Sequence, residues 1–305
     1  FEDKFASYIG SQYAVAVSNG TAALHLSALA LGVQEGSRVI TSPITFTSSA
    51  NCIRFCGGTI EFCDIDPNTL CLDIDKVREK LEAAPKGTYH GIIPVDFAGY
   101  AVNMEAFREL ANEYGMWILE DSCHAPGGFF NDQNGNQQNC GNGKFADAAI
   151  FSFHPVKHIA CGEGGMITTN DPKIYQKLLL LRSHGITKEP DTLIKNDGAW
   201  YYEMQLLGYN YRMPDILCTL GISQLDRAVE GLKIRREIAQ KYIKTFSDLP
   251  ITIPKSSLHP GHAFHLFVIQ VDERKALYDY LKENGISAQI HYIPVHKQPY
   301  YVDLY

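Results

Sequence analysis

Short hydrophobic runs alternate with longer segments of helical periodicity along most of this chain, and this alternation restricts the possible folds more than any other feature. Hydrophobic runs of about four to eight residues are typical of strands, whereas apolar residues that recur about every 3.6 positions indicate amphipathic helices. Strands and helices that alternate in this way build a mostly parallel sheet with helices on its faces. The sequence therefore predicts an α/β fold.

Specific segments follow from the same periodicities. We expect strands of the sheet at 13–18, 38–41, 91–96, 116–120, 148–153 and 165–168. The segments between them predict helices at 22–31, 75–83, 104–114 and 172–182. Nearer the C-terminus, we expect strands at 263–271 and 287–292 around a helix at 273–284. The polar segment 131–144, rich in Gly and Asn, is typical of an exposed loop or hairpin.

The chain has 305 residues, which is long enough for one large domain and a smaller one. We assign 1–214 to the large domain and 215–246, an amphipathic run with few helix breakers, to a connecting helix. Residues 247–305 are predicted to form part of a small α/β domain. Because Phe1 is not an initiator Met and the pattern stops abruptly at Tyr305, we expect the chain to be truncated at both ends.

Charge and composition argue against two classes of partner. The net charge is −7, from 27 Lys+Arg and 34 Asp+Glu, whereas binding to nucleic acid depends on clustered positive charge. No run reaches the roughly 18 apolar residues that suggest a membrane-spanning helix. We therefore expect neither a nucleic acid nor a membrane as a partner.

The cysteines and histidines do not predict a metal site. The eight cysteines form no CxxC pair, and we expect reduced thiols and a cytoplasmic protein. Cys52 and Cys56 lie four residues apart without a second pair to complete a zinc site. His259, His262 and His265 are spaced three apart, but alternation along the expected strand would place His265 in a different setting.

The first segment with chemical potential is the turn Asn19-Gly20-Thr21-Ala22, between the first strand and the first helix. N–H groups in the first turn of a helix have no acceptor within the helix, and the helix dipole adds positive character, so a phosphate is favoured there. Gly20, Thr21 and Ala22 are the candidates for holding it. The alternative is that Thr21 only caps its helix.

The second segment is Glu120-Asp121-Ser122-Cys123-His124, where an apolar run leads directly into carboxylates. Open α/β sheets bind their ligands at the carboxyl ends of the strands. Asp121 is therefore either a ligand-binding residue or a loop aspartate that caps a turn. His124 either contacts the same ligand or is a core histidine.

The third segment is Phe151-Ser152-Phe153-His154-Pro155-Val156-Lys157, followed by a glycine cluster at 162–165. The strand delivers Ser152, and Pro155 interrupts regular structure. Lys157 is thereby left on a loop, where it is either a solvated surface lysine or a functional amine. Together, the three segments offer a phosphate site, a carboxylate for a ring nitrogen and an amine for a carbonyl, and pyridoxal phosphate has all three matching groups.

With these motifs, essentially the whole chain resembles the DegT/DnrJ/EryC1/StrS family of sugar aminotransferases. Segments 152–157, 200–204 and 291–296 are similar to the branch of this family that acts in pseudaminic acid biosynthesis. The resemblance implies fold type I of the pyridoxal phosphate-dependent transferases, with a mostly parallel central sheet flanked by helices. It also implies a smaller C-terminal α/β domain, whose end is missing here.

The resemblance assigns roles to individual residues. Lys157 would bind the cofactor covalently, and Asp121 would pair with its ring nitrogen. Other positions match residues that hold the phosphate, stack on the ring or lie near the phenolic oxygen, namely Gly20, Thr21, Ala22, Ser152, Phe46 and His124. Asn210 matches an asparagine that reaches the phosphate of the neighbouring subunit, which implies a homodimer with a shared active site. Apart from the resemblance, His184 and Arg212 are candidates for binding the nucleotide, with a structural role as the alternative, and Tyr209 is a candidate for contacting the sugar or the base.

The implied reaction moves an amino group from L-glutamate, through pyridoxamine phosphate, to C4 of a UDP-linked 4-keto-6-deoxy-N-acetylhexosamine. Several alternatives stay open: amination at C3, another nucleotide-linked keto sugar, or a non-catalytic sugar-binding protein on the same fold. A dehydratase relative would carry histidine in place of Lys157. A nicotinamide-dependent dehydrogenase is disfavoured because no GxGxxG follows the first strand.

Overall fold

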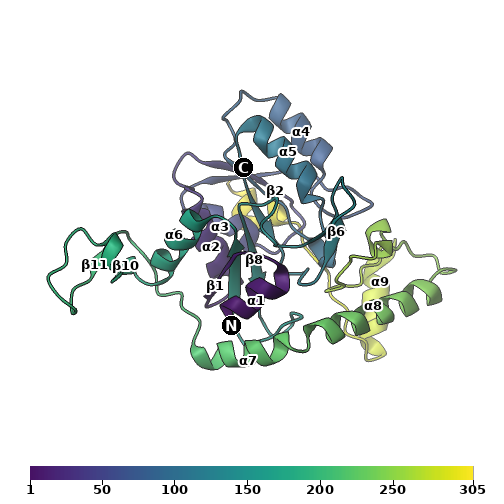
Figure 1. The fold of residues 1–305 in the computed structure, drawn as a ribbon. Coiled ribbons are helices and arrows are strands. Elements are labelled where there is room, and N and C mark those ends of the chain that lie inside the picture. The colour runs from purple at the N-terminus through teal and green to yellow at the C-terminus, as the bar shows by residue number, and fades with distance from the viewer. Residues whose placement is uncertain (305) are drawn as a thin grey trace.

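A seven-stranded sheet forms the centre of the structure, a computed structural model that describes residues 1–304 (Figure 1). In spatial order its strands are β1 (Tyr13–Val17), β9 (Gly165–Thr169), β8 (Ala148–Ser152), β5 (Trp117–Asp121), β4 (Gly91–Ile93), β2 (Arg38–Thr41) and β3 (Thr59–Phe62). β9 runs antiparallel to β1 and β8, and the other neighbours pair in parallel. The predicted α/β fold with a mostly parallel sheet is confirmed.

Each face of the sheet has its own hydrophobic core. Val39 and Ile93 belong to one core and their neighbours Ile40 and Ile92 to the opposite one, because side chains alternate along a strand. The first core is covered by α2 (Gly20–Ala30), α3 (Ser48–Phe55) and α6 (Pro172–Arg182). The opposite face is covered by α4 (Ile74–Glu82), α5 (Met104–Tyr114) and, near β1, α1 (Glu2–Ile9). Both faces are therefore buried, as a parallel sheet requires.

Local signals set the ends of two predicted helices. The Asn103 side chain accepts a hydrogen bond from the Ala106 N–H at the start of α5, and Gly115, with φ 71°, ends that helix. Asp171 caps α6 immediately before Pro172. The helices predicted at 104–114 and 172–182 are confirmed residue for residue.

Some elements differ from the sequence expectation. Segment 131–144 contains most of a hairpin, whose strands are β6 (Phe129–Asn131) and β7 (Gln137–Asn139). Around the main sheet, α1, α3 and β3 were not predicted. The expected single helix at 215–246 is wrong, because α7 (Asp215–Leu225) and α8 (Ala228–Thr245) are separate. Between them the Arg227 N–H donates to the Gln224 carbonyl, an i−3 acceptor, which breaks the i−4 ladder of an α-helix.

The strands expected at 263–271 and 287–292 are also wrong, although α9 (Arg274–Glu283) forms close to the expected range 273–284. Within residues 1–304, segment 263–271 pairs with another strand-like segment only at the single bridge between Thr252 and Gln270. Its Ala263 and Leu266 N–H groups donate instead to the turn at Gly99 and Ala98. An alternating pattern forms a strand only where a neighbouring strand takes up its backbone hydrogen bonds.

The remaining elements lie at the periphery. A short ribbon of β10 (Ile186–Thr187) and β11 (Glu203–Met204) projects from one side of the molecule (Figure 1). Short helices complete the described chain: η1 (Phe97–Gly99), η2 (Pro190–Thr192), η3 (Lys255–Leu258), η4 (Val295–Lys297) and α10 (Pro299–Val302). The segment around η4 returns to the large sheet, because the Val295 N–H donates to the Pro43 carbonyl and the Tyr301 hydroxyl donates to Asn51. No described helix combines the length and apolar character needed to cross a bilayer.

Candidate active site

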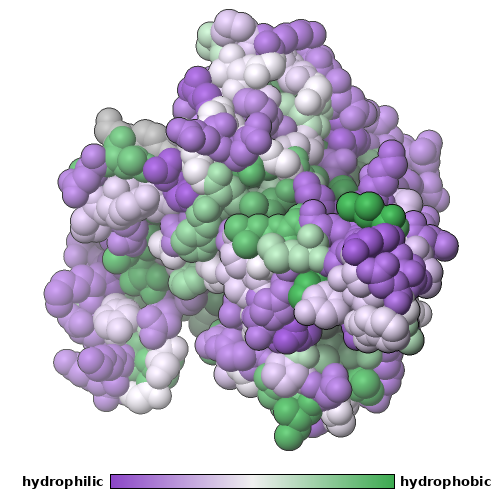
Figure 2. All heavy atoms as spheres, turned by 90° about the vertical axis from the view of Figure 1, so that its left-hand side faces the viewer, coloured by the Kyte–Doolittle hydropathy of each residue, from purple (hydrophilic) through white to green (hydrophobic). Residues whose placement is uncertain are grey.

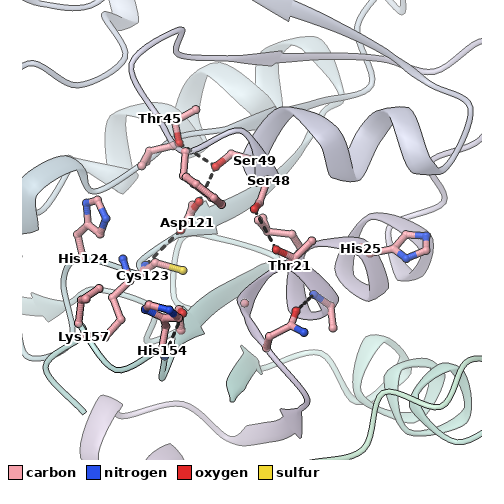
Figure 3. Close-up of a pocket in the computed structure, with 18 of the residues that line it drawn as sticks. Thr21, His25, Thr45, Ser48, Ser49, Asp121, Cys123, His124, His154 and Lys157 are labelled. Atoms are coloured by element: carbon pink, nitrogen blue, oxygen red, sulfur yellow. Dashed lines mark hydrogen bonds between the residues drawn. The ribbon is translucent and has the colours of Figure 1, made fainter. Parts of the chain in front are cut away.

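A pocket of about 730 Å³ lies at the carboxyl ends of β5 and β8, beside the start of α2. Figure 3 shows its residues converging from these elements and from α3. Every residue predicted to contact the cofactor, except Asn210, lines it: Gly20, Thr21, Ala22, Phe46, Asp121, His124, Ser152 and Lys157. The three segments singled out in the sequence therefore meet at one cavity.

The N-terminus of α2 opens into one end of this pocket. The Asn19 side chain accepts a 2.8 Å hydrogen bond from the Ala22 N–H, so Asn19 caps the helix and the alternative that Thr21 is the cap is wrong. The N–H groups of Gly20 and Thr21 lie in the first turn, where no acceptor within the helix exists. These two groups, rather than the already bonded Ala22 N–H, offer hydrogen bonds to an anion.

Gly20 is needed where α2 approaches the end of β8. A Cβ at this position would lie 3.0 Å from the Ser152 Cβ and 3.3 Å from its Oγ. That spacing is tighter than ordinary van der Waals contact, so a larger residue would push the two segments apart. The Thr21 hydroxyl lies 2.9 Å from Ser48 Oγ. The Gly20 and Thr21 N–H groups and the Ser152 hydroxyl therefore lie close together at this end of the pocket.

Asp121, the last residue of β5, presents a buried carboxylate to the centre of the pocket. Its Oδ2 accepts a 2.7 Å hydrogen bond from the Ser49 hydroxyl, and its Oδ1 accepts a 3.2 Å bond from the Cys123 N–H (Figure 3). These two bonds fix the carboxylate and leave it facing the pocket. A protonated ring nitrogen is a suitable partner for such a group.

Lys157 is held by a loop that closes on itself. After β8 ends, the Lys157 N–H donates to the His154 carbonyl, and the Cys161 N–H donates back to Phe153. Burial lowers the pKa of the Lys157 amine, whereas the nearby Asp121 carboxylate opposes the shift. The Lys157 side chain is therefore a partly buried amine inside the pocket rather than a surface lysine.

A cluster of rings surrounds the lysine. His124 Nε2 lies 3.3 Å from the Tyr292 hydroxyl, and the His124 ring packs on His265 with centroids 4.3 Å apart. Burial lowers the pKa of His124 well below its ordinary value and that of His265 to about 2, and the Lys157 charge adds to both shifts. Both imidazoles are therefore neutral at pH 7. Phe46, which is 60% exposed, lines the opening next to Tyr292.

Four predicted residues lie outside the lining of this pocket. They are Asn210, His184, Tyr209 and Arg212. Asn210 and Arg212 are exposed, on a segment that bonds to the end of β1 and that also carries Tyr211, a lining residue. Their positions beside the opening leave them available to a ligand or to another chain.

Several lining residues were not predicted. α3 and the loop before it contribute Thr45, Ser48 and Ser49, and the C-terminal segment contributes His265, His291 and Tyr292. The run Thr47-Ser48-Ser49 is too weak a signal to predict α3, because serine is a weak helix former and the Thr47 side chain makes no capping hydrogen bond. No local signal could have placed His265, because its approach to Lys157 joins residues 108 positions apart.

Potential metal ligands converge elsewhere. Among the described residues, the buried side chains of Asp96, Glu120 and Cys140 bring three possible metal-ligand atoms within 4.8 Å of one another. The Ser122 hydroxyl lies within hydrogen-bond distance of Asp96 Oδ2 (2.8 Å) and Glu120 Oε1 (2.9 Å). His262, by contrast, uses Nδ1 to accept the Phe264 N–H and stacks on the Phe264 ring.

Comparison with known proteins identifies the family. The family model of the DegT/DnrJ/EryC1/StrS aminotransferases matches residues 1–305. The chain belongs to this family. Among curated proteins it is 41% identical to the spore coat polysaccharide biosynthesis protein SpsC of Bacillus subtilis, over 99% of this chain and 77% of SpsC.

Solved structures agree with this assignment. PseC of Helicobacter pylori, an aminotransferase involved in the biosynthesis of pseudoaminic acid, is 30% identical with a TM-score of 0.86, over 100% of this chain and 79% of PseC. NtdA of Bacillus subtilis, solved with bound cofactor PMP, is 28% identical with a TM-score of 0.82, over 99% of this chain and 66% of NtdA. The protein is a pyridoxal phosphate-dependent sugar aminotransferase of fold type I.

The residues of the pocket fit this cofactor. An anion-binding helix start, a fixed buried carboxylate and a partly buried amine line one cavity. They correspond to the phosphate, the ring nitrogen and the aldehyde of pyridoxal phosphate. The exposed ring of Phe46 at the opening offers a flat apolar surface on which the cofactor ring could stack.

Proposed function

We propose that this aminotransferase transfers the amino group of L-glutamate to C4 of a UDP-linked 4-keto-6-deoxy-N-acetylhexosamine, as a step toward pseudaminic acid. The similarity to PseC over the full length of this chain supports that assignment most directly. Two of the segments that resemble the pseudaminic branch, 152–157 and 291–296, contribute residues to the pocket. The residues of these two segments therefore lie where they can discriminate between substrates.

Each group of the pocket has a part in this reaction. When bound, pyridoxal phosphate supplies an electron-accepting ring that acidifies the α-carbon of the amino donor. Gly20, Thr21 and Ser152 bind the phosphate, and the Asp121 carboxylate holds a proton on the ring nitrogen. Lys157 binds the aldehyde covalently and, once released, its amine carries a proton between two adjacent carbons.

The state of the Lys157 amine matters for that last role. An ordinary lysine has a pKa of about 10.4 and is almost fully protonated at neutral pH, so it is not a base. Burial lowers the pKa of Lys157, which increases the fraction of free amine. The burial of Lys157 therefore serves the proton transfer.

A second candidate substrate is another nucleotide-linked keto sugar used for a surface polysaccharide. The higher identity to SpsC, a protein of spore coat polysaccharide biosynthesis, favours it. The two candidates share the cofactor chemistry and differ in the sugar and in the carbon that receives the amine.

We also propose a homodimer in which Asn210 reaches the phosphate site of the second subunit. Asn210 is exposed and does not line the pocket of its own chain. Large hydrophobic side chains are exposed in the same region, among them Trp200 at 75% and Leu207 at 75%. Figure 2 shows hydrophobic side chains gathered around a hollow on the face that carries the β10–β11 ribbon. Burial of such a surface against a second copy is favourable.

The test is a product analysis with purified protein. The enzyme is mixed with pyridoxal phosphate, L-glutamate and, separately, UDP-linked 4-keto and 3-keto sugars, and the products are identified by NMR. We expect a 4-amino sugar and 2-oxoglutarate from the 4-keto substrate alone. Amination of the 3-keto sugar instead, or of neither, would contradict the proposed substrate.

A covalent-trapping experiment tests the assignment of the lysine. Borohydride reduction of the loaded enzyme should fix pyridoxal phosphate on Lys157, and Lys157→Ala should lose both the trapped cofactor and the activity. Lys173→Ala, which changes an exposed lysine of α6, is the control and should retain both. Cofactor that is still trapped on Lys157→Ala would overturn the assignment.

A further inference from the structure

The Lys157 amine has a neighbour that the roles described so far do not use. Its Nζ lies 3.4 Å from Nε2 of His265, a residue 108 positions later in the chain. This is a long hydrogen bond, and catalytic hydrogen bonds are often long before the ligands are in place. The contact joins the loop after β8 to the segment that follows the helix α8.

The backbone around His265 is firmly held. The Leu266 N–H donates to the Ala98 carbonyl and the Ala263 N–H donates to the Gly99 carbonyl at 2.7 Å. Gly99 permits this approach, since a Cβ there would lie 2.7 Å from the Phe264 nitrogen. Backbone anchoring on both sides of His265 holds its Cα in place beside the pocket.

The ring itself is packed between two other imidazoles. Its centroid lies 4.3 Å from that of His124 and 5.6 Å from that of His158. Nδ1 of His265 is buried and has no hydrogen-bond partner within the described chain, so Nε2, directed at Lys157, makes the polar contact of this ring. Buried polar side chains nearly always have a hydrogen-bond partner. For His265 that partner is Lys157.

The surroundings of the pair are mostly neutral. The titratable and charged groups that influence Lys157 and His265 are Asp121, Cys123, His124, His158, Arg235 and His291. Burial lowers the pKa of His158 to about 3 and also lowers that of His291, so these rings carry no charge at pH 7. Burial also raises the pKa of the Cys123 thiol, which keeps it protonated. His265 is therefore a neutral hydrogen-bond partner of Lys157 and adds no positive charge that would repel the ammonium.

We propose that His265 is a positioning residue of the transamination, whose Nε2 holds the Lys157 amine in the pocket whenever that lysine is not attached to the cofactor. This inference rests on the proposed role of Lys157. An imidazole suits the task because it bonds to both forms of the amine. Nε2 accepts from the ammonium when the ring proton is on Nδ1, and it donates to the free amine when the ring proton is on Nε2.

The test compares three variants. His265→Phe keeps a ring of similar shape but removes the hydrogen bond, whereas His265→Gln places an amide near the position of Nε2 and restores an acceptor and a donor. His259→Phe is the matched control, because His259 lies on the same segment and does not line the pocket. His265→Met, which is apolar and flexible, carries the test if the Phe variant does not fold.

The readout is the pKa of Lys157 itself, measured in enzyme freed of cofactor and in enzyme loaded with pyridoxamine phosphate. Acetic anhydride labels the amine over a range of pH, and mass spectrometry of the Lys157 peptide gives the labelled fraction. Because the bond that the charged ammonium donates is stronger than the one that the neutral amine accepts, His265→Phe should lower the pKa of Lys157 by about one unit, a tenfold change in the dissociation constant. His265→Gln should restore it, and His259→Phe should leave it unchanged.

A space-filling role for His265 predicts the opposite result. Loss of packing would admit water and raise the pKa of Lys157 toward its ordinary value. An unchanged or raised pKa in His265→Phe, no recovery in His265→Gln, or an equal shift in His259→Phe would each overturn the proposal. Failure of the proposed role of Lys157 is distinguishable, because borohydride would then trap the cofactor on a different lysine of the wild-type enzyme.

Discussion

The Ser49 hydroxyl donates a 2.7 Å hydrogen bond to the Asp121 carboxylate, and this bond joins helix α3 to the end of strand β5. Both side chains are buried. The single proton of Ser49 is used in this bond, so the Thr45 hydroxyl, 2.8 Å from Ser49 Oγ, is the donor to Ser49. A short chain of hydroxyl groups therefore orients the carboxylate that we propose as the partner of the cofactor's ring nitrogen.

Removal of this support should reduce turnover. A hydrogen bond to a charged group contributes about 1.5–3 kcal/mol, so we expect Ser49→Ala to lower kcat roughly ten- to hundredfold. Thr45→Val removes only the outer hydroxyl of the chain and should change kcat by less than about threefold. Steady-state kinetics at saturating cofactor checks both values. Equal losses in the two variants would contradict an orienting role of Ser49.

Asp121 should be important for catalysis more than for binding. Asp121→Asn keeps the size of the side chain and its hydrogen-bonding oxygen but removes the negative charge that holds a proton on the ring nitrogen. Loss of one such electrostatic contribution typically costs roughly 10²–10³-fold in kcat. Cofactor affinity, measured by fluorescence titration, should change by less than about tenfold, because the phosphate contacts remain. A variant that loses affinity and keeps its turnover would refute this role.

The fold was predictable from the sequence wherever a segment carries a clear periodicity and its own end signals. The helix α5 is the best example, because Asn103 and Gly115 mark its limits in the sequence. The helix α3 carries no such pattern, since Ser48, Ser49 and Asn51 are weak helix formers and its stability comes from packing of residues such as Ile53 in the core. Local sequence could not show that helix or the serines it places in the pocket.

The candidate site was predictable to the same extent. The pocket residues at positions 20, 121 and 152 each stand at the end of a strand or the start of a helix, Lys157 lies on the loop that follows β8, and the topology of a parallel sheet brings such positions together. His265 and Tyr292 come from two segments, 263–271 and 287–292, that were expected to be strands. They reach the pocket because their segments bond to turns of the large sheet, a long-range choice that spacing does not reveal.

Gly20 should tolerate no side chain without a loss of cofactor binding. The Cβ of Gly20→Ala would lie 3.0 Å from the Ser152 Cβ, which forces the start of α2 away from the end of β8. Overpacking of this kind costs about 1–3 kcal/mol, and we expect the Kd for pyridoxal phosphate to rise roughly tenfold.

A second glycine provides the control for this prediction. Gly231, in the helix α8, has nothing within 4 Å of the corresponding Cβ position. Gly231→Ala should therefore leave cofactor binding unchanged and raise the free energy of unfolding by about 0.5–1 kcal/mol, because alanine favours the helix. Isothermal titration and urea unfolding measure the two quantities. Unchanged affinity in Gly20→Ala would show that the close approach to Ser152 does not matter for the phosphate site.

The buried pair Asp96 and Glu120 should make stability depend on pH. Burial, with the neighbouring Asp96 charge, raises the pKa of Glu120 well above its ordinary value, and burial raises that of Asp96 to about 6. As pH rises above about 4.5, Glu120 loses its proton in the unfolded chain but keeps it in the folded protein. The folded state then binds more protons than the unfolded state, so this group lowers the free energy of unfolding as pH increases.

Glu120→Gln should remove that dependence. The amide oxygen can accept the 2.9 Å hydrogen bond that Glu120 Oε1 receives from the Gly141 N–H, and the amide NH₂ can replace the carboxyl proton as a donor to Asp96. The free energy of unfolding of the variant minus that of the wild type should increase by at least about 1.4 kcal/mol from pH 5 to pH 8, the equivalent of one pKa unit. Urea unfolding at both pH values measures the gain, with Glu35→Gln, at an exposed position, as the control. A difference between variant and wild type that is the same at pH 5 and pH 8 would mean that Glu120 is not protonated in the folded protein.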